Sequence, residues 1–211
     1  MRVFHILNQM MENKVAVVIR GDSPDQAIKT ADACVKGGSK TLEVTFTVPD
    51  ADDVLRTLVQ KYPDAVIGAG TVLDSETARL AIVRGASFIV SPSFDPEVAK
   101  LCNRYAVPYL PGIMTVREAT EALAYGAQVV KLFPGEMYAP SFIKTLRGPL
   151  PHLQLMPTGG VDLNNVQEWL QAGAVMLGAG GAITGPAKIG DYEEVTRLAG
   201  EFQRLAGEVQ L

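Results

Sequence analysis

The chain has 211 residues, of which 47% are hydrophobic and 20% charged, so it is long enough to bury a large core within one domain. Its net charge is −4, and without a run of Lys and Arg it is not expected to bind nucleic acid. No stretch is apolar enough over sufficient length to cross a membrane, and the polar residues between Met1 and Lys14 argue against a signal peptide.

Short runs of β-branched or apolar residues recur along the chain at spacings of roughly 20 to 25 residues, as strands do when helices separate them. The predicted strands are Val15–Arg20, Thr41–Phe46, Ala65–Ala69, Phe88–Ser91, Val107–Leu110, Val129–Phe133, Leu153–Pro157 and Val175–Gly178. The segments between them have helical spacing, and several begin at Asp or Ser and end near Gly. The predicted helices include Ser23–Lys36, Asp50–Lys61, Ser75–Arg84, Asp95–Tyr105, Thr115–Ala124 and Leu163–Ala172. This alternation predicts an α/β protein with a parallel sheet.

Eight such units follow one another without a linker or a change in composition. We therefore expect a single domain over residues 1–211, a closed (β/α)8 TIM barrel, with Met1–Glu12 as an extra helix that covers its bottom. A doubly wound open sheet is the alternative. In a barrel, the active site lies where the strands end at their carboxyl-terminal face.

Two charged residues interrupt predicted strands. Glu43 lies on the same strand face as Thr41, Thr45 and other polar residues, which we expect to point into the barrel, and an unpaired carboxylate is costly to bury there. Lys131 interrupts an otherwise apolar strand, and if it points inward it meets Glu43. An apolar environment disfavours the ammonium form of a lysine, and the neutral amine is a nucleophile. A lysine at the rim with its ammonium group in water is the alternative interpretation.

Other strand ends carry residues suited to binding. Arg20 ends the first predicted strand and has a guanidinium group shaped to bind a carboxylate. Residues 157–160 (PTGG) and 178–182 (GAGGA) follow the seventh and eighth strands, where barrels commonly bind phosphate. Their glycines leave backbone N–H groups open to an anion, and the segment from Asp162 to Val166 can begin a helix whose positive end adds to the attraction.

These features resemble a known family, the 2-keto-3-deoxy-6-phosphogluconate (KDPG) and 4-hydroxy-2-oxoglutarate (KHG) aldolases. The resemblance covers nearly the whole chain. It is carried by the segments 42–49 (LEVTFTVP), 68–72 (GAGTV), 89–92 (IVSP), 110–112 (LPG), 131–134 (KLFP) and 157–161 (PTGGV), followed by the final glycine cluster.

The resemblance implies a trimeric, metal-independent class I aldolase of the Entner-Doudoroff type of carbohydrate metabolism. It implies that Lys131 forms a Schiff base, that Glu43 is the general acid and base, and that the products are pyruvate and glyceraldehyde 3-phosphate. It also implies the substrate contacts, namely Thr71 near the pyruvyl carboxylate, Phe133 and Pro92 as walls, Thr158 on the substrate, and Gly159, Gly160, Gly180 and Gly181 near the phosphate.

Two positions differ from many members of that family. Residues 45–49 (TFTVP) contain no arginine to bind the substrate carboxylate, and we expect Arg20 to take that role instead. Gly181 stands where many members have serine, which removes one hydrogen bond to the phosphate. Preference for a phosphorylated substrate is therefore less firmly implied than the aldolase chemistry.

No cofactor is expected, and His5 and His152 have no companion ligands that would predict a metal site. Cys34 and Cys102 are expected to be buried, reduced thiols, which fits the cytoplasm. The expected partners are a small keto acid, most readily a phosphorylated one, and further copies of the chain in a homotrimer. The alternatives are a 2-keto-3-deoxy-6-phosphogalactonate aldolase, a sugar-phosphate isomerase or epimerase, and a sugar-phosphate binding barrel without catalysis.

Overall fold

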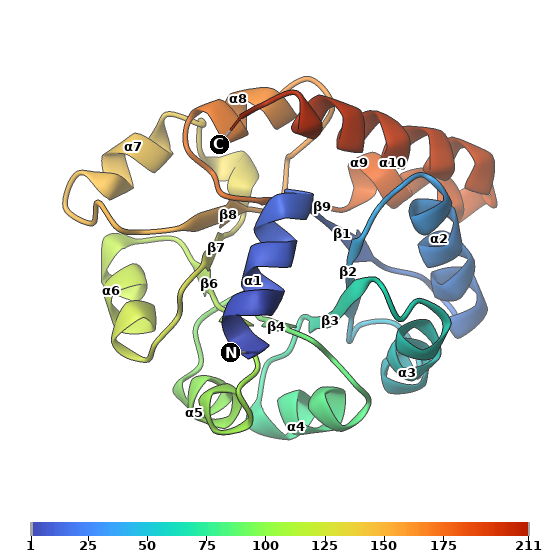
Figure 1. Ribbon diagram of the computed structural model, residues 1–211, viewed down its shortest axis with the longest axis horizontal. Helices are drawn as coiled ribbons and strands as arrows, with labels where there is room; N and C mark the ends of the chain where they lie inside the picture. Colours follow the sequence, from blue (N-terminus) through green and yellow to red (C-terminus); the bar gives the residue numbers. More distant parts are fainter. Residues whose placement is uncertain (1, 211) are drawn as a thin grey trace.

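Helices and parallel strands alternate along the chain in the computed structural model, which describes residues 2–210 (Figure 1). The strands are β1 (Val15–Ile19), β2 (Thr41–Thr45), β3 (Val66–Gly70), β4 (Ile89–Val90), β5 (Tyr109–Leu110), β6 (Gly112–Ile113), β7 (Val130–Leu132), β8 (Leu155–Pro157) and β9 (Leu177–Ala179). The α-helices are α1 (Arg2–Asn13), α2 (Pro24–Lys36), α3 (Ala51–Lys61), α4 (Ser75–Val83), α5 (Pro96–Tyr105), α6 (Val116–Ala124), α7 (Phe142–Arg147), α8 (Val166–Gln171), α9 (Gly181–Thr184) and α10 (Tyr192–Gly207). Two 3₁₀ helices, η1 (Gly135–Met137) and η2 (Gly185–Ile189), complete the set. The α/β class predicted from the sequence is confirmed.

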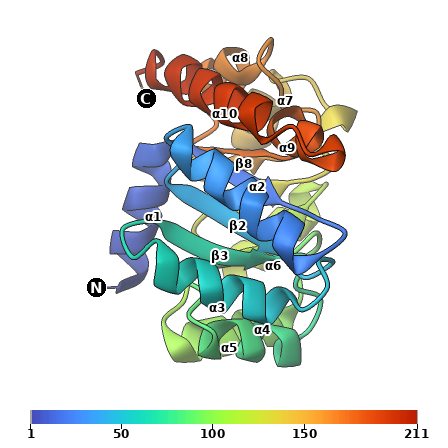
Figure 2. The ribbon, with the colours of Figure 1, turned by 90° about the vertical axis from the view of Figure 1, so that its right-hand side faces the viewer.

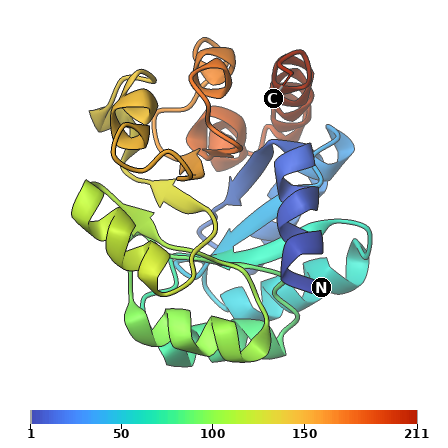
Figure 3. The same ribbon diagram turned by 60° about the vertical axis from the view of Figure 1, so that its left-hand side comes forward.

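The strands form two parallel sheets that curl around a shared interior, with α2 to α10 outside (Figures 1 and 3). One sheet has the order β5-β4-β3-β2-β1-β9, and the other has the order β6-β7-β8. Only Pro111 separates β5 from β6 along the chain. On the other side, a parallel bridge joins Thr158 to Gly178, and the backbone N–H of Val175 donates to the carbonyl of Leu155 at 3.0 Å.

Two apolar layers hold this arrangement together. Alternate residues of β1 and β2, such as Val17 and Leu42, pack outward with the helices in one large buried cluster. Inward-facing residues, among them Phe88, Leu110 and Met176, form a second cluster inside the amino-terminal end of the strands, called the lower end below. Burial of this apolar surface is the main force favouring the fold.

Helix α1 closes the lower end of the interior. Its buried residues Ile6, Leu7 and Met10 belong to the inner cluster, and Figure 2 shows α1 and α9 at opposite ends of the strands. The predicted extra helix Met1–Glu12 is thus found as Arg2–Asn13, while Met1 lies outside the described residues. The carboxyl ends of the strands are left for the functional site.

Some predicted boundaries were wrong. The helix expected over Leu163–Ala172 begins only at Val166, because the side chains of Asp162 and Asn165 accept hydrogen bonds from nearby backbone N–H groups and form a turn before it. The strand expected to end at Leu110 continues beyond Pro111 into β6. None of the helices in the described part has the length and hydropathy needed to cross a membrane.

Both cysteines are free and buried, as predicted. Burial disfavours the charged thiolate and raises the pKa of Cys34 and of Cys102 to about 12. Neither thiol is therefore poised to react near neutral pH.

Replacement of Met10 by alanine should lower the free energy of unfolding by about 2–5 kcal/mol, because it opens a cavity between α1 and the inner cluster. Asn8→Ala, on the exposed face of the same helix, is the control and should change it by at most about 0.5 kcal/mol. Urea denaturation followed by circular dichroism measures both. Equal stability of the two variants would show that α1 does not close the interior.

Candidate active site

Lys131 and Glu43 meet in the interior between the two sheets, as expected from the sequence for an inward-pointing Lys131. Lys131 Nζ lies 3.8 Å from Glu43 Oε1, and the two side chains are 7% and 1% exposed. Their strands, β7 and β2, belong to different sheets and are not neighbours, so the contact crosses the interior. The alternative of a lysine at the rim with its ammonium group in water is excluded.

Small residues make room for this pair. A side chain at Gly70 would collide with the Glu43 carboxylate, and one at Gly112, which pairs with Lys131 in the sheet, would collide with the carbonyl of Pro92. Neither carboxylate oxygen of Glu43 has a hydrogen-bond partner within residues 2–210. Lys131 Nζ also lies 4.9 Å from the centre of the Phe133 ring. Burial of a carboxylate without hydrogen bonds is energetically unfavourable, and attraction to the nearby ammonium group offsets part of this desolvation free energy.

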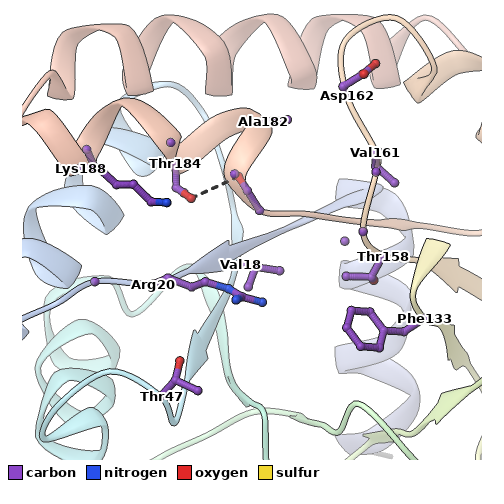
Figure 4. Close-up of a pocket in the computed structure, with 18 of the residues that line it drawn as sticks. Val18, Arg20, Thr47, Phe133, Thr158, Val161, Asp162, Ala182, Thr184 and Lys188 are labelled. Carbon is purple, nitrogen blue, oxygen red and sulfur yellow. Dashed lines mark hydrogen bonds between the residues drawn. The ribbon is translucent and has the colours of Figure 1, made fainter. Parts of the chain in front are cut away.

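A cavity of about 790 Å³ opens at the carboxyl ends of the strands (Figure 4). Predicted site residues that line it are Arg20, Phe133, Thr158, Gly159, Gly160, Gly180 and Gly181. Neither Lys131 nor Glu43 lines this cavity, but Phe133 does and its ring lies beside Lys131 Nζ, so the cavity comes close to the buried amine. The volume fits a small metabolite.

The two glycine loops form one wall of the cavity. Gly159 and Gly160 have φ values of +91° and +68°, a conformation that residues with side chains rarely adopt. Side chains there would also meet Glu136. Asn165 Nδ2 donates to the carbonyl of Gly160 at 2.8 Å and holds the loop. The sequence suggested that the start of a helix contributes to this wall. Helix α8 instead begins at Val166, beyond Asp162, the last residue of this loop that lines the cavity, so its first turn is not part of the wall.

Arg20 and Thr47 follow the ends of β1 and β2 and line the cavity on the side opposite this wall. The hydroxyl of Thr45 donates to the carbonyl of Ile19 at 3.0 Å and joins these two strand ends. The Arg20 side chain is exposed, and Figure 4 shows its guanidinium group extending across the cavity. It is therefore available to bind an anion.

Thr71 and Pro92 do not line this cavity, and each lies next to a glycine that neighbours the buried pair. Thr71 follows Gly70, next to the Glu43 carboxylate, and has a φ of +57°. Such a conformation costs a β-branched residue about 1–3 kcal/mol and is common at functional sites. The carbonyl of Pro92 lies against Gly112, beside Lys131.

The lining residues that were not singled out from the sequence include Asp22, Gln26 and Lys188. The last comes from η2, a short 3₁₀ helix without periodic pattern, so no signal in the sequence pointed to it. Within residues 2–210, no group of His, Cys, Asp and Glu side chains is arranged to hold a metal ion.

The family model described as "KDPG and KHG aldolase" matches residues 6–198. The chain belongs to this family. A 2-dehydro-3-deoxy-phosphogluconate aldolase from Treponema pallidum is 35% identical over 92% of this chain and 94% of its own length. A 2-dehydro-3-deoxy-6-phosphogalactonate aldolase from Escherichia coli strain K12 is 34% identical over 77% and 80%.

A solved structure of KDPG aldolase from Legionella pneumophila superimposes with a TM-score of 0.82 at 30% identity, over 89% of this chain and 92% of that one. In that structure, pyruvate is captured as a covalent carbinolamine intermediate. The predicted family and the predicted enzyme class, a carbon–carbon lyase, are confirmed.

Lys131→Met should lower the free energy of unfolding by about 3–5 kcal/mol, because it leaves the Glu43 carboxylate buried without its cation. Addition of Glu43→Gln should recover much of this loss, since the double variant buries no charge. Chemical denaturation of the single and double variants measures the coupling between them.

Lys144→Met is the control for this experiment, because Lys144 is exposed on α7 and its loss should cost at most about 0.5 kcal/mol. A Lys131→Met protein as stable as this control would contradict a buried ion pair.

Proposed function

We propose that this chain is a class I aldolase that cleaves KDPG to pyruvate and glyceraldehyde 3-phosphate through a Schiff base on Lys131. We also propose that it cleaves 4-hydroxy-2-oxoglutarate to pyruvate and glyoxylate. The observation that carries the proposal is the buried amine of Lys131, 3.8 Å from the Glu43 carboxylate and beside Phe133, which lines an open cavity.

In the proposed reaction, the ammonium group of Lys131 first transfers a proton to Glu43. The resulting neutral amine attacks the C2 ketone, and loss of water from the carbinolamine gives an iminium ion. Glu43 protonates the departing hydroxyl group and then, as carboxylate, takes the proton of the C4 hydroxyl. The C3–C4 bond breaks, its electron pair moves to the iminium nitrogen, and the aldehyde leaves. Protonation of the enamine at C3 and addition of water release pyruvate and regenerate the amine.

The substrate contacts extend this proposal along the cavity. Arg20 binds the carboxylate of the keto acid, with Thr71 beside it, and Phe133 and Pro92 form the walls around the reacting carbons. Thr158, Gly159, Gly160, Gly180 and Gly181 contact the far end of the substrate, where glycine N–H groups suit a phosphate. Seven of these nine residues line the cavity, which supports the assignment.

A second candidate substrate is 2-keto-3-deoxy-6-phosphogalactonate, which differs from KDPG in configuration at C4. The similarity to the Escherichia coli galactonate enzyme favours it. Both substrates require the same Schiff base, so the buried pair does not separate them. Steady-state kcat/KM on the two epimers and on 4-hydroxy-2-oxoglutarate decides between them.

We further propose that residues 1–211 form one domain, a complete (β/α)8 barrel, closed where β5 continues through Pro111 into β6 and where β8 meets β9. Three copies are proposed to assemble as in the family, which analytical ultracentrifugation tests by giving three times the chain mass.

The cytoplasm, proposed as the location, is a reducing compartment and suits the free thiols of Cys34 and Cys102. Fractionation of cells that produce the protein tests this.

Borohydride reduction in the presence of pyruvate should attach a stable adduct to Lys131, because reduction traps the iminium ion. Peptide mass spectrometry locates the adduct. Lys131→Met should give none, and Lys144→Met should react like the unaltered protein. An adduct at another lysine, or none, would contradict the proposed function.

A further inference from the structure

Lys188 places a second positive charge on the cavity, at the side away from the buried pair. It comes from η2 and lines the cavity together with Gly180, Gly181 and Thr184. In Figure 4 its ammonium group points into the cavity toward Thr184, and Phe133 lies on the opposite side. Lys188 therefore lies across the cavity from Phe133, the lining residue beside Lys131.

The charge of Lys188 is not neutralised by a neighbouring carboxylate. No ion pair or side-chain hydrogen bond within residues 2–210 involves its ammonium group. Two carboxylates, Asp22 and Asp162, also line the cavity, but Asp162 already accepts hydrogen bonds from the N–H groups of Asn164 and Asn165. Lys188 is thus free to attract an anion.

Gln26 fixes the position of η2 relative to the other cavity wall. Its Nε2 donates to the carbonyl of Ala187 at 3.0 Å, and its Oε1 accepts from the N–H of Asp22 at 2.7 Å. One side chain therefore connects the residue before Lys188 with the loop that follows Arg20. This connection holds Arg20 and Lys188 at the same cavity, although they are far apart in the sequence.

We infer that Lys188 is a specificity-determining residue that binds the terminal phosphate of the substrate. The inference rests on the proposed function for the identity of the substrate. Gly181 offers no hydroxyl group at this end of the cavity, and a side chain built there would have no atom within 4 Å. A flexible ammonium group reaching into this open space supplies the charge that the glycine loops lack.

The test compares Lys188→Gln with Lys188→Arg, and Lys144→Gln serves as the matched control on an exposed helix face. Titration calorimetry with inorganic phosphate should show about tenfold weaker binding for Lys188→Gln, and close to unaltered binding for the arginine variant and the control. A loss of this size is that expected for a charge-assisted hydrogen bond at a partly exposed site.

Kinetics give a second readout. For Lys188→Gln, kcat/KM on KDPG should fall about tenfold, whereas kcat/KM on the unphosphorylated 2-keto-3-deoxygluconate should stay unchanged. Equal kcat/KM losses on both substrates, or unchanged phosphate binding, would overturn the inference.

Trapping of pyruvate on Lys131 is measured in the same proteins. If the unaltered protein traps no pyruvate, the proposed function fails, while weaker phosphate binding by Lys188→Gln still supports an anion site at Lys188. If trapping succeeds and Lys188→Gln binds phosphate normally, only the inference about Lys188 fails.

Discussion

The pairing of Lys131 with Glu43 is the interaction on which the site depends. Transfer of two charges from water into the interior costs on the order of several kcal/mol of desolvation free energy for each ion, and attraction between close, opposite charges offsets part of it. The structure meets this demand by placing the residues on strands from different sheets and by keeping glycine at positions 70 and 112, where side chains would collide with their surroundings. The Glu43 carboxylate accepts no hydrogen bond within residues 2–210, which in the proposed reaction leaves it free to exchange protons with the substrate.

The residues that stabilise the interior and the residues that line the cavity lie at opposite ends of the strands. The lower interior is filled by apolar side chains and closed by α1, whereas the upper end is built from loops with glycine and short helices. Gln26 and Asn165 hold these loops through hydrogen bonds to backbone carbonyls. A rigid lower layer of this kind allows the upper loops to vary without loss of the fold.

Most of the fold could be predicted because its signals are local. The strand Val15–Arg20 is visible as a β-branched run, and Ser23 before Pro24 marks a helix start that the structure has at Pro24. Glu43 and Lys131 were found because each is a charged residue within a predicted strand, where it is expected to be buried. The start of α8 was missed because Asp162 and Asn165 satisfy backbone N–H groups before the helix begins. Lys188 could not be found, because only folding brings η2 to the cavity that Arg20 lines.

Closure of the lower end of the strands by α1 affects the order in which the two products of the proposed reaction leave. Because α1 and the inner apolar cluster close that end within residues 2–210, we expect substrate and products to pass through the cavity at the carboxyl ends of the strands. In the proposed reaction, the three carbons bound to Lys131 are the deepest part of the ligand, and the aldehyde fragment lies between them and solvent. The aldehyde must therefore leave first and the keto acid last, which makes product release sequential rather than random.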